Sequence, residues 1–260
     1  MGIYAVTGGS SGIGARTAEL LRAQGNTVYD IDIRNADIFG DLSSPEGRKN
    51  VIDALHKECP DGLDGLVCCA GVSNSCGNLK LILSLNYFGC VALANGVFDL
   101  LKKKRGACVV ISSNTISSGA ARMDVVDFLN NHEDENRSRK LVENLDPVRD
   151  GHSIYVATKY ALVRWMRRVS AQWAADGVRI NAVAPGNVAT AMTARMTPQE
   201  WNATMALPIP TMYGKEALMD PTDIAEAIIF LVSSKGHGVN GVCLFADGGT
   251  DALLNSEKVY

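Results

Sequence analysis

The chain has 260 residues, a formal net charge of −3 and a pI near 5.8, with 47% hydrophobic and 20% charged residues. This balance is typical of a globular protein and gives no electrostatic reason to expect nucleic acid or an anionic membrane as a partner. No run approaches the roughly 18 uninterrupted apolar residues of a membrane span, and the glycine-rich turn comes too early for a signal peptide. We therefore expect a cytoplasmic protein.

The cysteines and histidines give no sign of a metal site. The seven cysteines form no C-x-x-C pair, and several lie in apolar, strand-like runs, which favours buried, reduced thiols. The four histidines lack metal-ligand spacing. We expect no bound metal.

Apolar runs alternate with helical patterns along the whole chain. The expected strands and helices, in order, are Ile3–Thr7, a helix at 12–23, Thr27–Ile31, a helix at 45–57, Gly65–Cys69, a long helical stretch to Lys104, Ala107–Ser112, a helix at 153–176, Val178–Ala184, a helix at 221–232 and Val242–Ala246. Such alternation predicts one α/β domain over 1–260: a Rossmann-type, doubly wound parallel sheet of about seven strands with helices on both faces. Ligands of such sheets bind outside the carboxyl ends of the strands.

Two segments are longer than simple connections require. Residues 119–152, here called the inserted segment, are rich in charge but carry apolar residues with partial helical periodicity. We interpret them as an amphipathic helical excursion on the body; a mobile loop is the alternative. Residues 191–218, here called the lid segment, contain four methionines and Trp201. They suit a flexible apolar lid over a substrate, or else a surface helix with a buried stripe.

A glycine-rich turn follows the first strand and opens the first helix. It contains Gly8, Gly12 and Gly14, with Ser10, Ser11 and Ile13 between them. Backbone N–H groups of such a turn can hold a pyrophosphate at the positive end of the helix, although a plain tight turn would also need glycines.

The second strand ends in acidic residues at the spacing at which a carboxylate meets the adenosine ribose. Strand alternation lets one of Asp30 and Asp32 point there, and Asp32 is better placed. A carboxylate accepts hydrogen bonds from the ribose hydroxyls and repels a 2′-phosphate, so we expect NAD in preference to NADP. Arg34 is the complication, since a guanidinium could pair with a 2′-phosphate.

Tyr155 and Lys159 are four positions apart on a predicted helix, so they share one face. The lysine charge can then favour the phenolate. To titrate near neutral pH, a tyrosine needs a pKa roughly three units below that of the free side chain, which corresponds to about 4 kcal/mol of differential stabilisation.

Seven short motifs, in one order and spacing, give a specific resemblance over almost the whole chain. They are Thr7-Gly8-x-x-x-Gly12-Ile13-Gly14, Cys69-Ala70-Gly71, Asn86, Ile111-Ser112-Ser113, Tyr155-x-x-x-Lys159, Pro185-Gly186-x-x-x-Thr190 and Asp247-Gly248-Gly249. The set resembles the short-chain dehydrogenase/reductase family. The usual Asn-Asn-Ala-Gly of the family is Cys68-Cys69-Ala70-Gly71 here; because that motif acts partly through its backbone, we expect cofactor binding to survive.

The resemblance implies a role for each matching position. Tyr155 would be the general acid for carbonyl reduction or the base for alcohol oxidation, and Lys159 would lower its pKa and hold the nicotinamide ribose. Ser113 would hydrogen-bond the substrate oxygen, and Asn86 would position a water in the proton path. The implied cofactor contacts are Gly8, Ser10, Ser11, Gly12, Ile13, Gly14, Asp32, Asp41, Leu42, Cys69, Ala70, Gly71, Tyr155, Lys159, Pro185, Gly186, Val188 and Thr190. For Asp41 a turn or capping role is equally consistent.

Within the family the chain is most similar to the bacterial hydroxysteroid dehydrogenase/carbonyl reductase branch. Ser113 and Tyr155 are 42 positions apart, about thirty more than is usual in the family. A bulky secondary alcohol, such as a steroid, suits the apolar lid segment, while a non-steroid carbonyl or a non-catalytic, dinucleotide-sensing regulator remain the alternatives. Because the inserted segment precedes the catalytic helix, we expect a homo-oligomer, a dimer or tetramer, that assembles through a face other than that helix.

Overall fold

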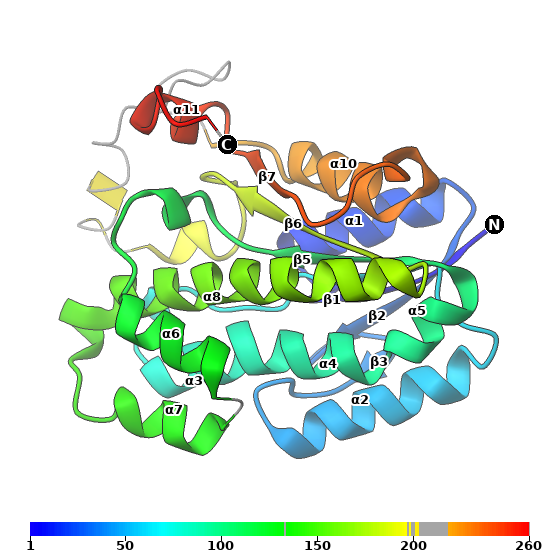
Figure 1. The fold of residues 1–260 in the computed structure, drawn as a ribbon, viewed down its shortest axis with the longest axis horizontal. Helices are drawn as coiled ribbons and strands as arrows, with labels where there is room; N and C mark the ends of the chain where they lie inside the picture. The colour runs from blue at the N-terminus through cyan, green and yellow to red at the C-terminus, as the bar shows by residue number, and fades with distance from the viewer. Residues whose placement is uncertain (133, 197, 199–200, 203–217, 260) are drawn as a thin grey trace.

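The computed structural model describes residues 1–132, 134–196, 198, 201–202 and 218–259. One parallel sheet runs through it in the order β3-β2-β1-β4-β5-β6-β7 (Figure 1). The strands are β1 (Ile3–Thr7), β2 (Thr27–Asp32), β3 (Ile38–Phe39), β4 (Gly65–Cys68), β5 (Ala107–Ile111), β6 (Arg179–Pro185) and β7 (Cys243–Ala246). This confirms the predicted doubly wound fold. The edge strand β3 was not among the expected strands, because two residues are too short to show a period of two.

Helices cover both faces of the sheet. The helices are α1 (Gly12–Ala23), α2 (Pro45–Glu58), α3 (Leu79–Leu83), α4 (Cys90–Gly96), α5 (Phe98–Lys104), α6 (Met123–Asn131), α7 (Glu135–Leu141), α8 (Pro147–Ala175), α10 (Pro221–Val232) and α11 (Thr250–Leu254). Helices α1 and α10 lie side by side on one face, and α2, α4 and α8 lie on the other (Figure 1).

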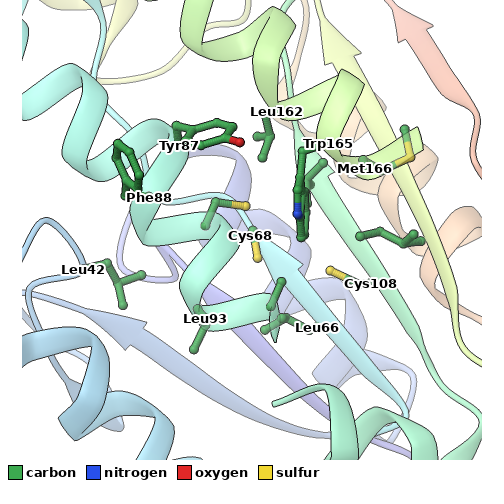
Figure 2. Packing of buried hydrophobic residues seen from close by; sticks show 14 of the residues in the cluster. Leu42, Leu66, Cys68, Tyr87, Phe88, Leu93, Cys108, Leu162, Trp165 and Met166 are labelled. Atoms are coloured by element: carbon green, nitrogen blue, oxygen red, sulfur yellow. The ribbon is translucent and has the colours of Figure 1, made fainter. Parts of the chain in front are cut away.

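Alternation along the strands divides the buried side chains between two cores. On β5, Cys108 and Val110 belong to the core beneath α8, whereas Val109 and Ile111 belong to the core beneath α10. Figure 2 shows Cys68 and Cys108 near Trp165 of α8, in the first of these cores. A strand buried on both faces reads as a continuous apolar run, which is why these strands were visible in the sequence.

Helix α8 begins six residues earlier than expected. The carboxylate of Asp146 caps it by accepting hydrogen bonds from the backbone N–H groups of Val148 and Arg149, and Pro147 occupies the first turn. Proline at this position lacks only an N–H that would be unpaired in any case. Gly151 continues the helix, and Asn74 lies against it.

The long helical stretch expected up to Lys104 consists of α3, a π-helical segment at Ser84–Gly89, α4 and α5. The span Leu79–Gly96 is long and apolar enough to cross a membrane by length and composition, although Lys80, Ser84 and two asparagines interrupt its apolar residues. It is 61% buried within the protein, as a core helix is.

The inserted segment folds as α6, α7 and the first turn of α8. Val125, Val126 and Leu129 of α6 are buried, while the opposite side of that helix is exposed. Helix α6 packs along α8, where Arg164 forms an ion pair with Asp127 of α6. The inserted segment therefore covers part of the outer side of α8.

Candidate active site

The sheet order reverses between β1 and β4, and the loops that follow these strands form the centre of the site. Gly8 and Gly12 have φ of +67° and +56°, values that favour glycine. A Cβ on Gly14 would lie 2.3 Å from the Gly8 carbonyl oxygen. Ser11 precedes α1 in an extended conformation, and its side chain does not cap the helix. The first N–H groups of α1 thus fit an anionic ligand, as a pyrophosphate requires.

The loop after β4 packs directly against the glycine-rich turn. The Ala70 backbone N–H donates to the Thr7 hydroxyl oxygen at 2.9 Å, and a Cβ on Gly8 would lie 3.0 Å from the Ala70 nitrogen. The contacts of this loop with the turn are made by backbone atoms, so the cysteines that replace the usual asparagines leave them intact. Burial raises the pKa of the Cys69 thiol to about 12, which keeps it protonated and inert.

Asp30 and Asp32 have different surroundings at the end of β2. The Asp30 carboxylate pairs with Arg22, at 2.9 Å. The Asp32 carboxylate accepts hydrogen bonds from the backbone N–H groups of Ser10 and Ile33, at 3.3 and 2.7 Å. Both side chains lie beside the glycine-rich turn: Asp30 packs against Gly9, where a Cβ would lie 2.7 Å from its Oδ1, whereas Asp32 accepts a hydrogen bond from the turn.

Asp41 and Leu42 follow β3. The Asp41 carboxylate accepts a hydrogen bond from the Ser43 backbone N–H at 2.9 Å, which is the turn role left open by the sequence. Leu42 is buried.

Ser113, Tyr155 and Lys159 come together between the end of β5 and α8. The Ser113 hydroxyl oxygen accepts hydrogen bonds from the backbone N–H and the hydroxyl of Thr115, at 3.3 and 3.0 Å. A hydroxyl has two lone pairs and one proton, so its own proton is left to donate. The Lys159 ammonium donates to the Ile111 carbonyl oxygen at 2.8 Å and lies 5.8 Å from the centre of the Tyr155 ring.

Burial dominates the electrostatics of this group. Burial raises the pKa of Tyr155, and its hydrogen bond with Ser113 lowers that pKa by a smaller amount. Burial also lowers the pKa of Lys159 to about 8, against smaller opposing effects of Cys90 and Cys69. The Lys159 ammonium is held by Ile111 in this structure, and the expectation that it lowers the pKa of Tyr155 stays a prediction.

Asn86 lies in the π-helical segment, a geometry common at functional sites. Its amide oxygen accepts a hydrogen bond from the Val72 N–H, and its amide nitrogen donates to the Val72 carbonyl oxygen, both at 2.9 Å. The side chain thus fixes the loop after β4, and the expected task of positioning a water stays a prediction.

The loop after β6 completes the site. Gly186 passes close to Asp247, where a Cβ would lie 2.9 Å from the Asp247 Cα. Thr190 donates its backbone N–H to the hydroxyl of Thr193, which donates to the Val188 carbonyl oxygen. The lid segment is described at 191–196, 198, 201–202 and 218; its other residues, and the lid prediction for them, lie outside the described part of the chain.

A cavity of about 450 Å³ lies between several of these loops. Its lining includes Ser10, Ser11, Asp32 and Gly71, together with Arg34. Ala191, Met192 and Arg195, which also line it, belong to the lid segment, whereas sequence reasoning gave no site role to the other lining residues, namely Ile33, Asn35, Val72, Ser73, Ser75 and Cys76. It also missed Thr115, for which the Ser-x-Thr spacing after a strand was an available signal. In the described part of the chain, no group of three or more His, Cys, Asp or Glu residues could hold a metal.

Comparison with known proteins agrees with this geometry. Residues 3–125 match the family model described as short chain dehydrogenase, and residues 145–251 match the model described as Enoyl-(Acyl carrier protein) reductase. The chain is 35% identical to the 3-alpha-hydroxysteroid dehydrogenase/carbonyl reductase of Comamonas testosteroni, over 98% of both chains. It is 31% identical to the coniferyl-alcohol dehydrogenase of Pseudomonas sp. (strain HR199 / DSM 7063), over 94% of both.

Among solved structures, the 3-alpha-hydroxysteroid dehydrogenase from Pseudomonas sp. B-0831 complexed with NADH superposes with a TM-score of 0.90. It is 37% identical to this chain, and the match covers 99% of this chain and 100% of that one. The chain therefore belongs to the short-chain dehydrogenase/reductase family and is a nicotinamide-dependent oxidoreductase that acts on alcohol and carbonyl groups.

Proposed function

We propose that this protein is an NAD-dependent 3α-hydroxysteroid dehydrogenase/carbonyl reductase. The observation that carries the substrate class is the 35% identity to the Comamonas testosteroni protein of that name over 98% of both chains. The inserted segment lies within that alignment, so the similarity extends beyond the motifs shared by the wider family.

The preference for NAD is supported by Asp32. Its carboxylate lies beside the glycine-rich turn, where the N–H groups that open α1 would hold the pyrophosphate. A 2′-phosphate at this place would meet the negative charge of Asp32 at short range. The neighbouring structure of the Pseudomonas protein contains NADH, the cofactor without that phosphate.

Tyr155 transfers the proton in the proposed reaction. The bound dinucleotide supplies or accepts the hydride. Tyr155 gives its phenolic proton to the carbonyl oxygen in reduction and takes it from the alcohol in oxidation. Ser113 accepts two hydrogen bonds from Thr115, and its one hydroxyl proton, which is directed to Tyr155 in this structure, would turn to the same oxygen of the bound substrate.

Lys159 and Asn86 hold the site around this tyrosine. Lys159 keeps two ammonium protons free beyond its bond to Ile111, which suits the ribose hydroxyls of the nicotinamide end. Its charge also favours the phenolate during proton transfer. Asn86 fixes Val72, so that the loop after β4 keeps its place beside the cofactor.

The remaining proposed contacts place the cofactor along the same edge. Cys69, Ala70 and Gly71 would face the adenosine side through their backbone, and Pro185, Gly186, Val188 and Thr190 would flank the nicotinamide. Asp41 and Leu42 would border the adenine.

The test is NAD-linked turnover, followed by the absorbance of reduced nicotinamide, with 3α-hydroxysteroids, their 3β epimers and simple secondary alcohols. Selective oxidation of the 3α epimers supports the proposal. Turnover confined to non-steroid alcohols would replace the substrate while keeping the enzyme, and NADH binding without turnover of any substrate would favour a dinucleotide sensor.

We also propose a cytoplasmic homo-oligomer that does not assemble through α8. The packing of α6 along α8, with the ion pair between Asp127 and Arg164, supports this because it occupies part of that surface. Crosslinking of single cysteines introduced on α8 and on α10 tests it: links between α8 helices would contradict the proposal.

A further inference from the structure

Arg48 lies almost fully buried at the junction of three segments that are distant in the sequence. The residue is 7% exposed and belongs to the first turns of α2. Its guanidinium pairs with Glu135, the first residue of α7 in the inserted segment, through Nη1 at 2.7 Å and Nη2 at 3.0 Å. The Glu135 side chain is 14% exposed, so both partners are largely withdrawn from water.

The other donors of Arg48 bind backbone carbonyl oxygens. Nε donates to Leu42 at 2.7 Å, and Nη2 donates to Ser43 at 3.2 Å and to Ser84 at 3.0 Å. Leu42 and Ser43 form the loop proposed to border the adenine, and Ser84 begins the π-helical segment. The planar guanidinium of Arg48 thus joins this loop, the π-helical segment and α7, with its N–H donors held in a fixed planar arrangement.

The bonds from this cation add to the other supports of the loop, which are the turn formed by Asp41 and Ser43, the buried Leu42 side chain and close backbone packing. The Leu42 carbonyl oxygen rests on Gly89 at the end of the π-helical segment, where a Cβ would approach to 2.7 Å. Buried carbonyl oxygens that lose a charged donor are expensive to leave unpaired, so the loop would move to regain partners. The end of the segment near Asn86 has a separate attachment through Val72.

We propose that Arg48 is a positioning residue for the cofactor, and that Glu135 of the inserted segment, by holding Arg48, sets the affinity for the adenosine half of the dinucleotide. The guanidinium of Arg48 binds Leu42, Ser43, Ser84 and Glu135 and not Tyr155, Ser113 or Lys159. Because Asn86 has its separate attachment to Val72, Arg48 acts on binding and leaves the proton transfer unchanged. This inference rests on the proposed use of NAD.

The experiment measures the Kd for NADH and for ADP-ribose by fluorescence titration and competition, in the full-length protein. The variants are Arg48→Lys, which keeps the charge but loses the fork, Glu135→Gln, and both together. The matched control is Arg164→Lys, which alters another ion pair between the body and the inserted segment, the one with Asp127. Arg164 bonds Asp127 on α6, and Leu42 is not its hydrogen-bond partner, so this control leaves the bonds of the loop unchanged.

We expect Arg48→Lys to raise both Kd values about ten-fold, corresponding to about 1.4 kcal/mol, and Arg164→Lys to change them less than two-fold. Glu135→Gln should weaken binding in the same direction, and the double variant should lose less than the sum of the single losses, since the two residues act through one contact. In turnover, Arg48→Lys should raise the KM for NAD while kcat stays within about three-fold.

Unchanged Kd values in folded Arg48→Lys would overturn the inference, as would an equal loss in Arg164→Lys or a loss for NADH without one for ADP-ribose. If Arg48→Lys does not fold, Glu135→Gln decides by the same criteria. A wild-type protein that binds NADH but does not oxidise steroids contradicts the proposed substrate alone and leaves this test intact. Failure of the wild type to bind NADH would overturn the proposed cofactor and this inference together.

Discussion

Lys159 and the carbonyl oxygen of Ile111 are joined by a buried hydrogen bond of 2.8 Å, which ties the middle of α8 to the last residue of β5. Burial lowers the pKa of this lysine to about 8, so the charged form is less stable in the folded protein than in water. This hydrogen bond retains the ammonium in the site in spite of that loss of hydration.

The pH dependence of stability should reveal the buried lysine. In the unfolded chain its pKa is about 10.4, so between about pH 8 and 10.4 the unfolded state binds more protons and the free energy of unfolding rises with pH. Lys159→Met should therefore be most stabilised relative to wild type near pH 7, and this difference should shrink by up to about 3 kcal/mol as the pH approaches 10.

Urea unfolding of both proteins at pH 7, 8, 9 and 10 measures the difference. Lys104→Met, at an exposed lysine of α5, serves as the control and should show no comparable trend. A difference for Lys159→Met that is constant from pH 7 to 10 would contradict the lowered pKa.

Tyr155→Phe should retain NADH affinity within about three-fold and reduce turnover by about 10³-fold or more. The substitution removes the phenolic oxygen that carries the proton while keeping the aromatic ring in place. Fluorescence titration of NADH and steady-state turnover measure the two effects separately. Turnover near the wild-type rate would exclude Tyr155 as the proton donor.

Ser113→Ala should shift the pH dependence of kcat for alcohol oxidation to higher pH. The Ser113 hydroxyl lowers the pKa of Tyr155 against the larger effect of burial, so its loss leaves burial unopposed and raises that pKa further. For alcohol oxidation, which requires the phenolate, the rising limb of kcat against pH should shift upward. Thr115→Val is the control, since it leaves the Ser113 hydroxyl in place; an unshifted limb in Ser113→Ala would argue against the Ser113–Tyr155 contact.

Asp32→Ala should decrease the ratio of NAD to NADP efficiency by about ten-fold or more, because it removes the charge that repels a 2′-phosphate and leaves Arg34 nearby. The comparison is kcat/KM for each cofactor with one alcohol. Asp30→Asn is a matched control on the same strand, because it removes a charge that pairs with Arg22 and keeps the side chain that packs against Gly9. An equal change of the NAD to NADP ratio in both variants would mean that the cofactor preference depends on the total negative charge at the end of β2 and not on Asp32 itself.

The sequence by itself determined the order of strands and helices, because fully buried strands such as β4 and β5 read as continuous apolar runs, and glycine turns and helix patterns separate them. The same reasoning located the glycine-rich turn and the Tyr155–Lys159 pair, since both depend on short, local spacings. The strand β3 was missed because it consists of only two paired residues. The start of α8 was placed too late because a single capping carboxylate, that of Asp146, determines where this helix begins.

Only the tertiary structure decided which polar groups meet. The bonds of Asn86 with Val72 join residues 14 positions apart, and those of Arg48 with Glu135 join residues 87 positions apart. Neither follows from periodicity. The raised pKa of Tyr155 was likewise beyond the sequence, because burial depends on all the chain packed around a side chain, whereas the helical spacing to Lys159 gives only the possibility of a contact. Local patterns fix the elements and their faces, and three-dimensional packing fixes the partners and the electrostatics of the site.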